Sequence, residues 1–225
     1  MIESPIIALL SAGLGLGLLH AFDADHIMAV STLSNKRPSI KQSIKFCVQW
    51  AVGHGGVLVA LGVLIFALGW QLPESLSIWA ERIVGFMLIG LGGWLLFNIW
   101  RQTVRMNVHQ HGEITHVHLS KEQGNKHNHT PILVGITHGL AGSAPVLALV
   151  PAVSQGRLDV AIGYILLFSL GVMLSMFLFG ASLGSLQKWL QNRSNLLFNI
   201  SRGTVACLSI VLGGLWITES FAPLI

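Results

Sequence analysis

Charged residues are scarce in this sequence. Lysine, arginine, aspartate and glutamate together make up 10% of the 225 residues, whereas 52% are hydrophobic and the mean hydropathy is +0.69. A typical water-soluble domain has about 25% charged residues. The shortage of charge therefore excludes an ordinary soluble domain and indicates an integral membrane protein.

Cysteine is rare, and two common sequence signals are missing. Only Cys47 and Cys207 are present, with no C-x-x-C pair, so we expect no disulfide framework and interpret both as small buried hydrophobic residues. The first ten residues, MIESPIIALL, contain no lysine or arginine. They lack the basic region of a cleaved secretory signal, and we expect them to start the first membrane span. No H-E-x-x-H motif occurs, which argues against a membrane-embedded metalloenzyme.

Six apolar stretches are long enough to cross a bilayer, which takes about 20 residues per helix. They are Ile6–Leu33, Ser43–Gly69, Ile78–Ile99, Ile132–Val153, Asp159–Gly184 and Leu196–Thr218. The short alternating strands of a membrane barrel are not visible. We therefore predict an all-α membrane protein with six transmembrane helices.

Positive charge is distributed unevenly between the segments that join these stretches. Eleven of the 13 lysines and arginines follow the first, third or fifth stretch, whereas Arg82 and Arg157 lie on the other side. By the positive-inside rule, both termini face outward and the loop after the third stretch is cytoplasmic. This asymmetry explains the net charge of +4 in a cell-membrane protein, and we expect no nucleic-acid partner.

The two halves of the chain resemble each other. GLLHAFDADHIMAV, from Gly17, aligns with GITHGLAGSAPVLALV, from Gly135. The shared offset of 118 pairs His20 with His138, Trp50 with Phe168, Gly53 with Gly171 and Gly62 with Gly180. LGGWL at 91–95 matches LGGLW at 212–216 with an offset of 121. We predict two inverted three-helix repeats, residues 1–101 and 131–225, joined by a loop at 102–130. The alternative is that any two glycine-rich apolar helices align tolerably.

Four ionisable residues lie within the first apolar stretch, in LLHAFDADHIMAV. Each costs about 2.5–3.5 kcal/mol at membrane depth, so the cluster needs a reason. On a regular helix His20, Asp23 and His26 share a face, whereas Asp25 points away from them. Either the helix is locally unwound, or Asp25 orients a histidine from behind. A metal site, a proton relay and simple pairing between helices are all readings of this cluster.

Histidines in two other apolar stretches favour the metal interpretation. His54 lies in GHGGVLV, where glycines allow another backbone to approach, and His138 lies in THGLAGSAP. Pro145 either frees a backbone carbonyl in that stretch to line a cavity or only kinks the helix. The hydroxyls of Thr137 and Ser143 either contact the site or bond back to their own helix. Imidazole and carboxylate without thiolate suit divalent ions from manganese to nickel and zinc.

These motifs resemble those of the nickel/cobalt transporter (NiCoT) superfamily. HAFDADHI matches the H-(x)4-D-H signature, and GHGGVLV is similar to the second motif. HGLAGSAP, which stands where typical members carry acidic motifs, is similar to the urease-accessory-type nickel permease branch. The resemblance implies that His20, Asp25, His26 and His54 select nickel or cobalt, with Asp23 in the same signature. It also implies a helical membrane fold without an organic cofactor.

The loop between the third and fourth stretches is rich in histidine. Its three H-x-H pairs are His109 and His111, His116 and His118, and His127 and His129. Neutral imidazoles at this density bind nickel, cobalt, zinc or copper, so we expect an auxiliary metal reservoir. The alternative is a solvated linker with incidental histidines.

Together these patterns predict a permease for Ni²⁺ or Co²⁺ rather than an enzyme. The predicted metal ligands are His20, Asp23, Asp25, His26, His54 and His138. The ion is the transported substrate, no prosthetic group is expected, and the partners are the lipid bilayer and a cytoplasmic metallochaperone as a candidate. A membrane-embedded metalloenzyme with Asp23 or Asp25 as base, and a proton-coupled exporter of small molecules, are the alternatives. The direction of transport is open.

Overall fold

The computed structural model describes residues 3–34, 39–68, 74–106, 129–141 and 157–221. Within these ranges the chain is helical and contains no strand. The helices are α1 (Glu3–His20), α2 (Ala24–Ser34), α3 (Ile40–Leu68), α4 (Glu74–Met106), α5 (Thr130–Ala141), α7 (Leu158–Arg193) and α8 (Asn195–Phe221). The prediction of an all-α protein is confirmed for the part of the chain that is described.

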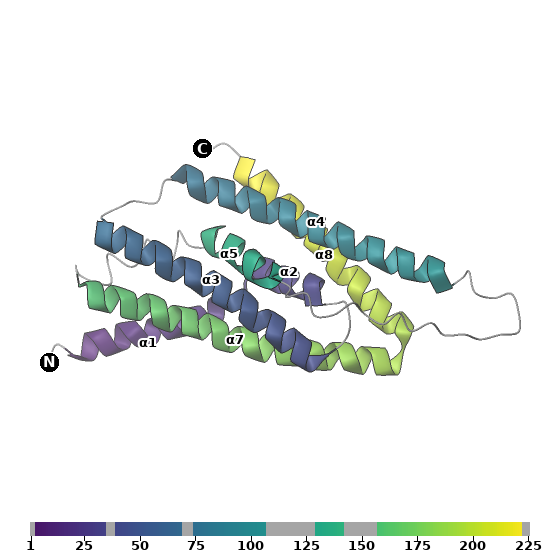
Figure 1. The fold of residues 1–225 in the computed structure, drawn as a ribbon, viewed down its shortest axis with the longest axis horizontal. Coiled ribbons are helices and arrows are strands. Elements are labelled where there is room, and N and C mark those ends of the chain that lie inside the picture. The colour runs from purple at the N-terminus through teal and green to yellow at the C-terminus, as the bar shows by residue number, and fades with distance from the viewer. Residues whose placement is uncertain (1–2, 35–38, 69–73, 107–128, 142–156, 222–225) are drawn as a thin grey trace, which may run out of the picture.

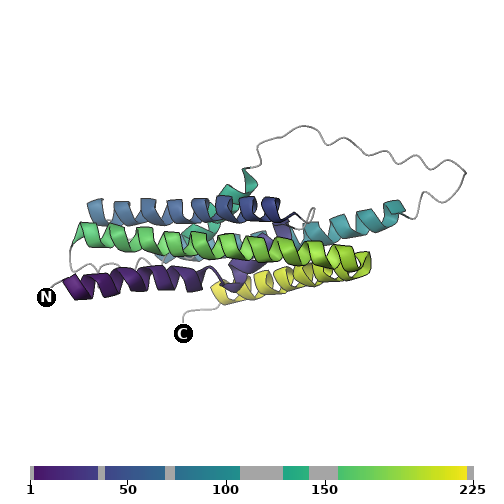
Figure 2. The ribbon, with the colours of Figure 1, turned by 90° about the horizontal axis from the view of Figure 1, so that it is seen from below.

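The helices form two groups with short helices between them. In the first group, α7 lies between α1 and α3 and packs against both (Figure 2). In the second group, α4 and α8 pack along each other (Figure 1). The short helices α2 and α5 lie between the groups, where α5 contacts α3 and α4 and α2 contacts α4 and α8.

Four of these helices are long and apolar enough to cross a membrane. They are α3, α4, α7 and α8, and a fifth span results if α1 and α2 are counted as one bent segment. The fourth predicted span is represented only by α5, which has 12 residues, because 142–156 lie outside the described residues. The protein is therefore a multi-pass membrane protein with four to five spans in the described ranges, against the six that we predicted.

The first predicted span is broken next to His20. Residues Ile6–His20 and Ala24–Ser34 form two helices bent by 52°. At the break, Phe22 N–H donates to Leu19 O at 2.9 Å instead of to Leu18 O. The Leu18 carbonyl accepts a hydrogen bond from Ser175 of α7 at 2.9 Å instead. The segment is therefore locally unwound, which is the first of the two alternatives. A serine of the neighbouring helix α7 donates to the carbonyl that loses its partner at the break.

Glycines set the close contacts within the first group. A Cβ atom on Gly17 of α1 would overlap the Phe168 carbonyl oxygen of α7, and one on Gly135 of α5 would overlap the Trp50 carbonyl oxygen of α3. Gly53 meets Ile132 O, and Gly171 meets Leu14 O, with equally little room. Only glycine allows backbones to approach this closely.

The α4–α8 pair is held in the same way. A Cβ on Gly92 would fall 2.6 Å from Ala206 O, and one on Gly213 would fall 2.6 Å from Gly85 O. Ser209 of α8 also donates a 2.8 Å hydrogen bond to Leu88 O of α4. By contrast, Gly93 and Gly214 face open space, so only the first glycine of each G-G pair, Gly92 or Gly213, makes the helix contact.

The two cysteines differ in their surroundings, which corrects one of our predictions. Both are free, and Cys47 is buried in α3 as predicted, but Cys207 is exposed on α8. Cys207 lies on the outward face of α8 together with Leu208, Val211 and Leu215, whereas the opposite face packs against α4. Both faces of a membrane helix are apolar, so the sequence does not distinguish a buried cysteine from an exposed one.

Candidate metal centre

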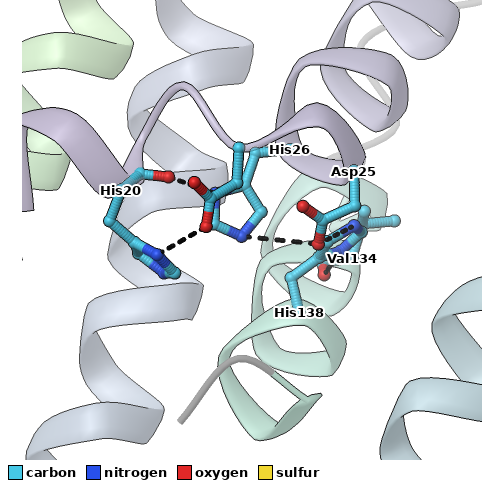
Figure 3. Close-up of polar contacts among 6 residues, drawn as sticks. His20, Asp25, His26, Val134 and His138 are labelled. Atoms are coloured by element: carbon cyan, nitrogen blue, oxygen red, sulfur yellow. Dashed lines mark hydrogen bonds and ion pairs between the residues drawn. The ribbon is translucent and has the colours of Figure 1, made fainter. Parts of the chain in front are cut away.

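Four helices each place one histidine at a common buried point. His20 ends α1, His26 lies in the first turn of α2, and His138 is near the end of α5 (Figure 3). His54 is near the middle of α3. The ring centroids of His26 lie 4.7 Å from His20, 5.1 Å from His54 and 5.5 Å from His138. His26, His54 and His138 are at most 1% exposed. The fold thus brings together imidazoles that are up to 118 residues apart in the sequence.

Asp23 orients the first of these rings. Its carboxylate lies 2.8 Å from Nδ1 of His20, and its side chain is half exposed. A carboxylate only accepts, so Nδ1 of His20 donates and Nε2 carries the lone pair. That Nε2 is buried and has no hydrogen-bond partner among the described residues. Asp23 therefore holds neutral His20 in the tautomer whose Nε2 is free to accept a proton or a metal ion.

The break between α1 and α2 orients His26. Its Nδ1 lies 3.1 Å from the carbonyl oxygen of His20, which also accepts from Asp23 N–H at 3.1 Å. Because a carbonyl oxygen cannot donate, Nδ1 of His26 carries the proton and Nε2 is left with its lone pair. A continuous helix would have used the His20 carbonyl internally, so the bend both places and orients this ring.

His138 reaches the same point with a matching tautomer. Its Nδ1 donates to Val134 O of its own helix at 2.9 Å, which leaves the lone pair on Nε2. Oδ2 of Asp25 lies 3.9 Å from this Nε2 and 3.6 Å from Nε2 of His26, as Figure 3 shows. Both distances are too long for hydrogen bonds. One buried carboxylate therefore faces the lone pairs of two rings from different halves of the chain.

His54 has no hydrogen bond at all within the described residues. Both of its ring nitrogens are buried and unpartnered, although the residue is fully buried. It is the fifteenth residue of the 29-residue α3, and a Cβ on its neighbour Gly53 would overlap the Ile132 carbonyl oxygen of α5. The glycine-rich context therefore has the packing role that the sequence indicated.

Two aromatic rings enclose the histidines and were not predicted to belong to the site. Trp50 is 0% exposed and stacks on His54 at 5.0 Å with a 15° interplanar angle. It also contacts His26 at 4.7 Å and His138 at 5.7 Å. Phe168 lies 5.2 Å from His20. The available signal was the spacing of Trp50 and His54, four residues apart on one helix face.

The donor atoms are close enough for a metal ion after small shifts. Ring nitrogens of His20, His26 and His54 lie within 4.8 Å of one another, and the same holds for ligand atoms of Asp23, Asp25 and His26. Metal–imidazole bonds of about 2.0–2.1 Å put two ligands at most about 4.2 Å apart. Three donors around one ion must lie closer still, at most about 3.6 Å apart in a trigonal arrangement, so the side chains of either group would have to move inward to coordinate it together.

The remaining predicted residues lie away from this point or outside the described ranges. Residues 107–128 and 142–156 are not described. The first range contains His109, His111, His116, His118 and His127, and the second contains Ser143 and Pro145. His129 is described and exposed. Thr137 donates to Leu133 O at 2.9 Å, so its hydroxyl bonds back to its own helix rather than to the site.

Two relatives of known name align with most of the chain. One is urease accessory protein UreH from Bacillus sp. (strain TB-90), 27% identical over 82% of this chain and 79% of the relative. The other is a candidate nickel/cobalt efflux system from Methanocaldococcus jannaschii, 27% identical over 72% of this chain and 69% of the relative. No solved structure is significantly similar to the chain. The resemblance to the urease-accessory-type branch is confirmed, and neither relative is named as an enzyme, in agreement with our expectation.

A protein-family model matches nearly the whole chain. Residues 10–214 match the transmembrane region of cytochrome c biogenesis proteins. This range begins in α1 and ends in α8, so it includes every residue of the histidine cluster. The chain therefore belongs to the family of the cytochrome c biogenesis protein transmembrane region.

Proposed function

We propose that this protein is a permease that moves Ni²⁺ or Co²⁺ across the cell membrane through the cluster of His20, Asp23, Asp25, His26, His54 and His138. The observation that carries the proposal is the gathering of buried ring nitrogens without hydrogen-bond partners, on His20, His54 and His138, where the Asp25 carboxylate faces His26 and His138. A divalent cation satisfies several lone pairs and the carboxylate at once. A single proton satisfies one nitrogen only.

The other readings of the cluster fit these contacts less well. A proton relay needs successive hydrogen bonds, but Asp25 lies 3.6 Å and 3.9 Å from the nearest ring nitrogens of His26 and His138. Pairing that merely holds helices together would give His54 a partner, and none exists among the described residues. Hydrolysis has less support, because the sequence has no H-E-x-x-H motif and neither relative is named as an enzyme.

The choice of metal rests on the donor atoms. Nitrogen-rich sites with carboxylate and without thiolate suit nickel, cobalt and zinc better than copper(I). Cys47 does not join the cluster, because its sulfur lies against Gly180 of α7. The name of the archaeal relative includes nickel and cobalt, which favours these two ions over zinc.

Reciprocal contacts support the proposal of two inverted repeats. With the offset of 118, Gly17 against Phe168 corresponds to Gly135 against Trp50. Gly53 against Ile132 likewise corresponds to Gly171 against Leu14. With the offset of 121, Gly92 against Ala206 corresponds to Gly213 against Gly85. Random alignment of glycine-rich helices would not reproduce the same partners, so we favour residues 1–101 and 131–225 as repeats with three spans each.

The orientation and the loop complete the proposal. The charge distribution favours both termini outside and residues 102–130 in the cytoplasm, where their histidines would hold metal before or after transport. A cytoplasmic metallochaperone would exchange metal with this loop. His26 contacts ligands from both repeats, so an ion would move by exchanging ligands around it.

The test is metal binding and transport by the purified full-length protein. We expect ⁶³Ni²⁺ to bind saturably in detergent and to cross the membrane of proteoliposomes. His20→Ala and Asp25→Ala should abolish transport, because each removes a buried donor without a substitute. Deletion of residues 109–129 should change the transport rate only.

Thr137→Ala is the matched control, since Thr137 precedes His138 but its hydroxyl bonds to its own helix. Full transport by folded Asp25→Ala protein would contradict the proposed site. Transport of a small organic molecule with protons, unaffected by Ni²⁺ or Co²⁺, would instead favour the exporter alternative.

A further inference from the structure

An arginine is buried in the membrane-spanning part of α8, far along the chain from the histidine cluster. Arg202 is 4% exposed and is the eighth residue of α8, so it lies about 10 Å along the helix from Asn195. One of its amino groups donates to Oε1 of Gln102 on α4 at 2.9 Å. Its guanidinium also lies 5.5 Å from the ring of Phe198.

These contacts give the guanidinium one neutral acceptor and no opposite charge. The group has five N–H donors, and Gln102 is a neutral acceptor for one of them. The Nε atom is buried without a hydrogen-bond partner, and no ion pair among the described residues includes Arg202. A buried charge without an opposite charge is costly, so an anion is the missing counterpart.

A cavity of about 290 Å³ opens beside this arginine. It is lined by Trp94, Leu95, Asn98, Gln102 and Arg202. Gln102, Asn98 and Trp94 are spaced four residues apart on α4 and therefore follow one face of the helix. Asn98 and Gln102 lie toward the end of α4, and Trp94 and Leu95 lie further from that end, so the lining changes from polar to apolar along the helix.

We propose that this cavity binds an anionic phospholipid, with the headgroup phosphate on Arg202 and Gln102 and the first acyl carbons along Leu95 and Trp94. The planar guanidinium matches two phosphate oxygens, and basic pockets between transmembrane helices are known places for acidic headgroups. The gradient from polar to apolar fits a lipid better than free phosphate, which has no apolar part. In the orientation proposed above, the lipid comes from the cytoplasmic leaflet.

The bound lipid would join α4 to α8 at the end where α4 stops and α8 starts. At the opposite end, Arg82 of α4 donates to Ser220 O at 3.0 Å and stacks on Phe221 of α8 at 3.9 Å. There a backbone carbonyl accepts from the arginine and an aromatic ring covers it, although its Nε, like that of Arg202, is buried without a partner among the described residues. At the Arg202 end, lipid phosphate takes that place.

The experiment measures lipid retention by the delipidated full-length protein with native mass spectrometry. Phosphatidylglycerol and phosphatidylcholine with the same acyl chains are added separately, each with and without inorganic phosphate at the same concentration as the lipid. We expect wild-type protein to retain one phosphatidylglycerol molecule at least tenfold more tightly than phosphatidylcholine. Arg202→Gln should lose this preference by about tenfold, as expected for a charged hydrogen bond.

Arg193→Gln is the matched control, because Arg193 is exposed at the same end of the protein and should leave retention unchanged. Arg202→Lys keeps the charge and should retain an intermediate preference, which separates binding from misfolding of the Gln variant. Equal retention of both lipids by wild type, or an unchanged preference in folded Arg202→Gln protein, would overturn the proposal. Displacement of the lipid by inorganic phosphate at equal concentration would also overturn it and assign the cavity to a free anion.

Discussion

Asp25 is a residue whose position could not be predicted from helical periodicity. A regular helix would turn Asp25 away from the face that His20, Asp23 and His26 share. The break at residues 21–23 rotates α2 relative to α1, and Asp25 then faces His26 and His138. The identities of the clustered residues were readable in the sequence, but their convergence depends on a bend that periodicity does not predict.

Asp23 should affect metal affinity through His20. We predict that Asp23→Asn lowers the affinity for Ni²⁺ by about 10- to 100-fold, because the ring loses the carboxylate that fixes its tautomer. Equilibrium dialysis of the purified variant with ⁶³Ni²⁺ measures this change.

The control for this variant is Asp159→Asn. Asp159 is an exposed aspartate that pairs with Arg157 at 2.6 Å, outside the histidine cluster. It should leave the affinity unchanged. An Asp23→Asn protein with wild-type affinity would show that His20 needs no such support.

Trp50 shows what residue patterns miss in an apolar sequence. The sequence alignment marked Trp50 only as the counterpart of Phe168. In the fold it is the ring that touches three of the four clustered histidines. Aromatic residues in a membrane helix face lipid, other helices or a site, and hydropathy does not distinguish these environments.

At the scale of elements, the glycine faces decide which helices pair. On α1, Gly17 faces the Phe168 carbonyl, whereas Gly15 has no neighbour within 4 Å. We predict that Gly17→Ala lowers the melting temperature of the detergent-solubilised protein strongly, because α1 and α7 must separate to make room. Overpacking of this kind costs roughly 1–3 kcal/mol or more.

Gly15→Ala is the companion variant, and its fluorescence-monitored melting temperature should stay equal or rise. Alanine favours the helix over glycine by up to about 1 kcal/mol. If both variants melted at the same temperature, the contact between α1 and α7 would not limit stability.

Ser175 joins α7 to the end of α1. We predict that Ser175→Ala destabilises the protein by roughly 1 kcal/mol, because the Leu18 carbonyl loses its donor in a buried position. Ser185→Ala, on the same helix, should have no effect, since the Ser185 hydroxyl is exposed and bonds to Ala181 O. Thermal unfolding of the two variants side by side provides the measurement.

The presence of a helix was predicted well where an apolar stretch was continuous, although α4 and α7 extend beyond the predicted stretches to Met106 and Arg193. The helices α3, α4, α7 and α8 include most of the predicted spans. The first span differs because Ala21, Phe22 and Asp23 form a turn that ends α1, and nothing in local hydropathy separates this turn from a helix. Glycine content indicated close packing, but only geometry distinguishes Gly92 from Gly93.

At the scale of the whole molecule, the two halves of the chain are interlocked. Helix α1 from the first half packs on α7 from the second, and α5 from the second packs on α3 from the first. The pair of α4 and α8 also joins the halves. The histidine cluster takes His20, His26 and His54 from one half and His138 from the other.

This interlocking predicts how the protein behaves when it is divided. A cut within residues 107–128 separates α1–α4 from α5–α8. We expect the two fragments, expressed together, to copurify and to bind Ni²⁺, because every contact between the halves is kept. Each fragment alone should aggregate in detergent and bind no metal at the cluster. A monodisperse first fragment with wild-type affinity would contradict this expectation.

The pairing of Gly17 with Phe168 also has a consequence for biogenesis. These residues are 151 positions apart, so a ribosome working at 5–20 residues per second needs roughly 8–30 s between them. During that time the nascent chain already holds two aspartates and three histidines inside or beside the bilayer, without the helix that later covers α1. The membrane insertion machinery must therefore shelter an unfinished, partly polar intermediate until the second half has been synthesised.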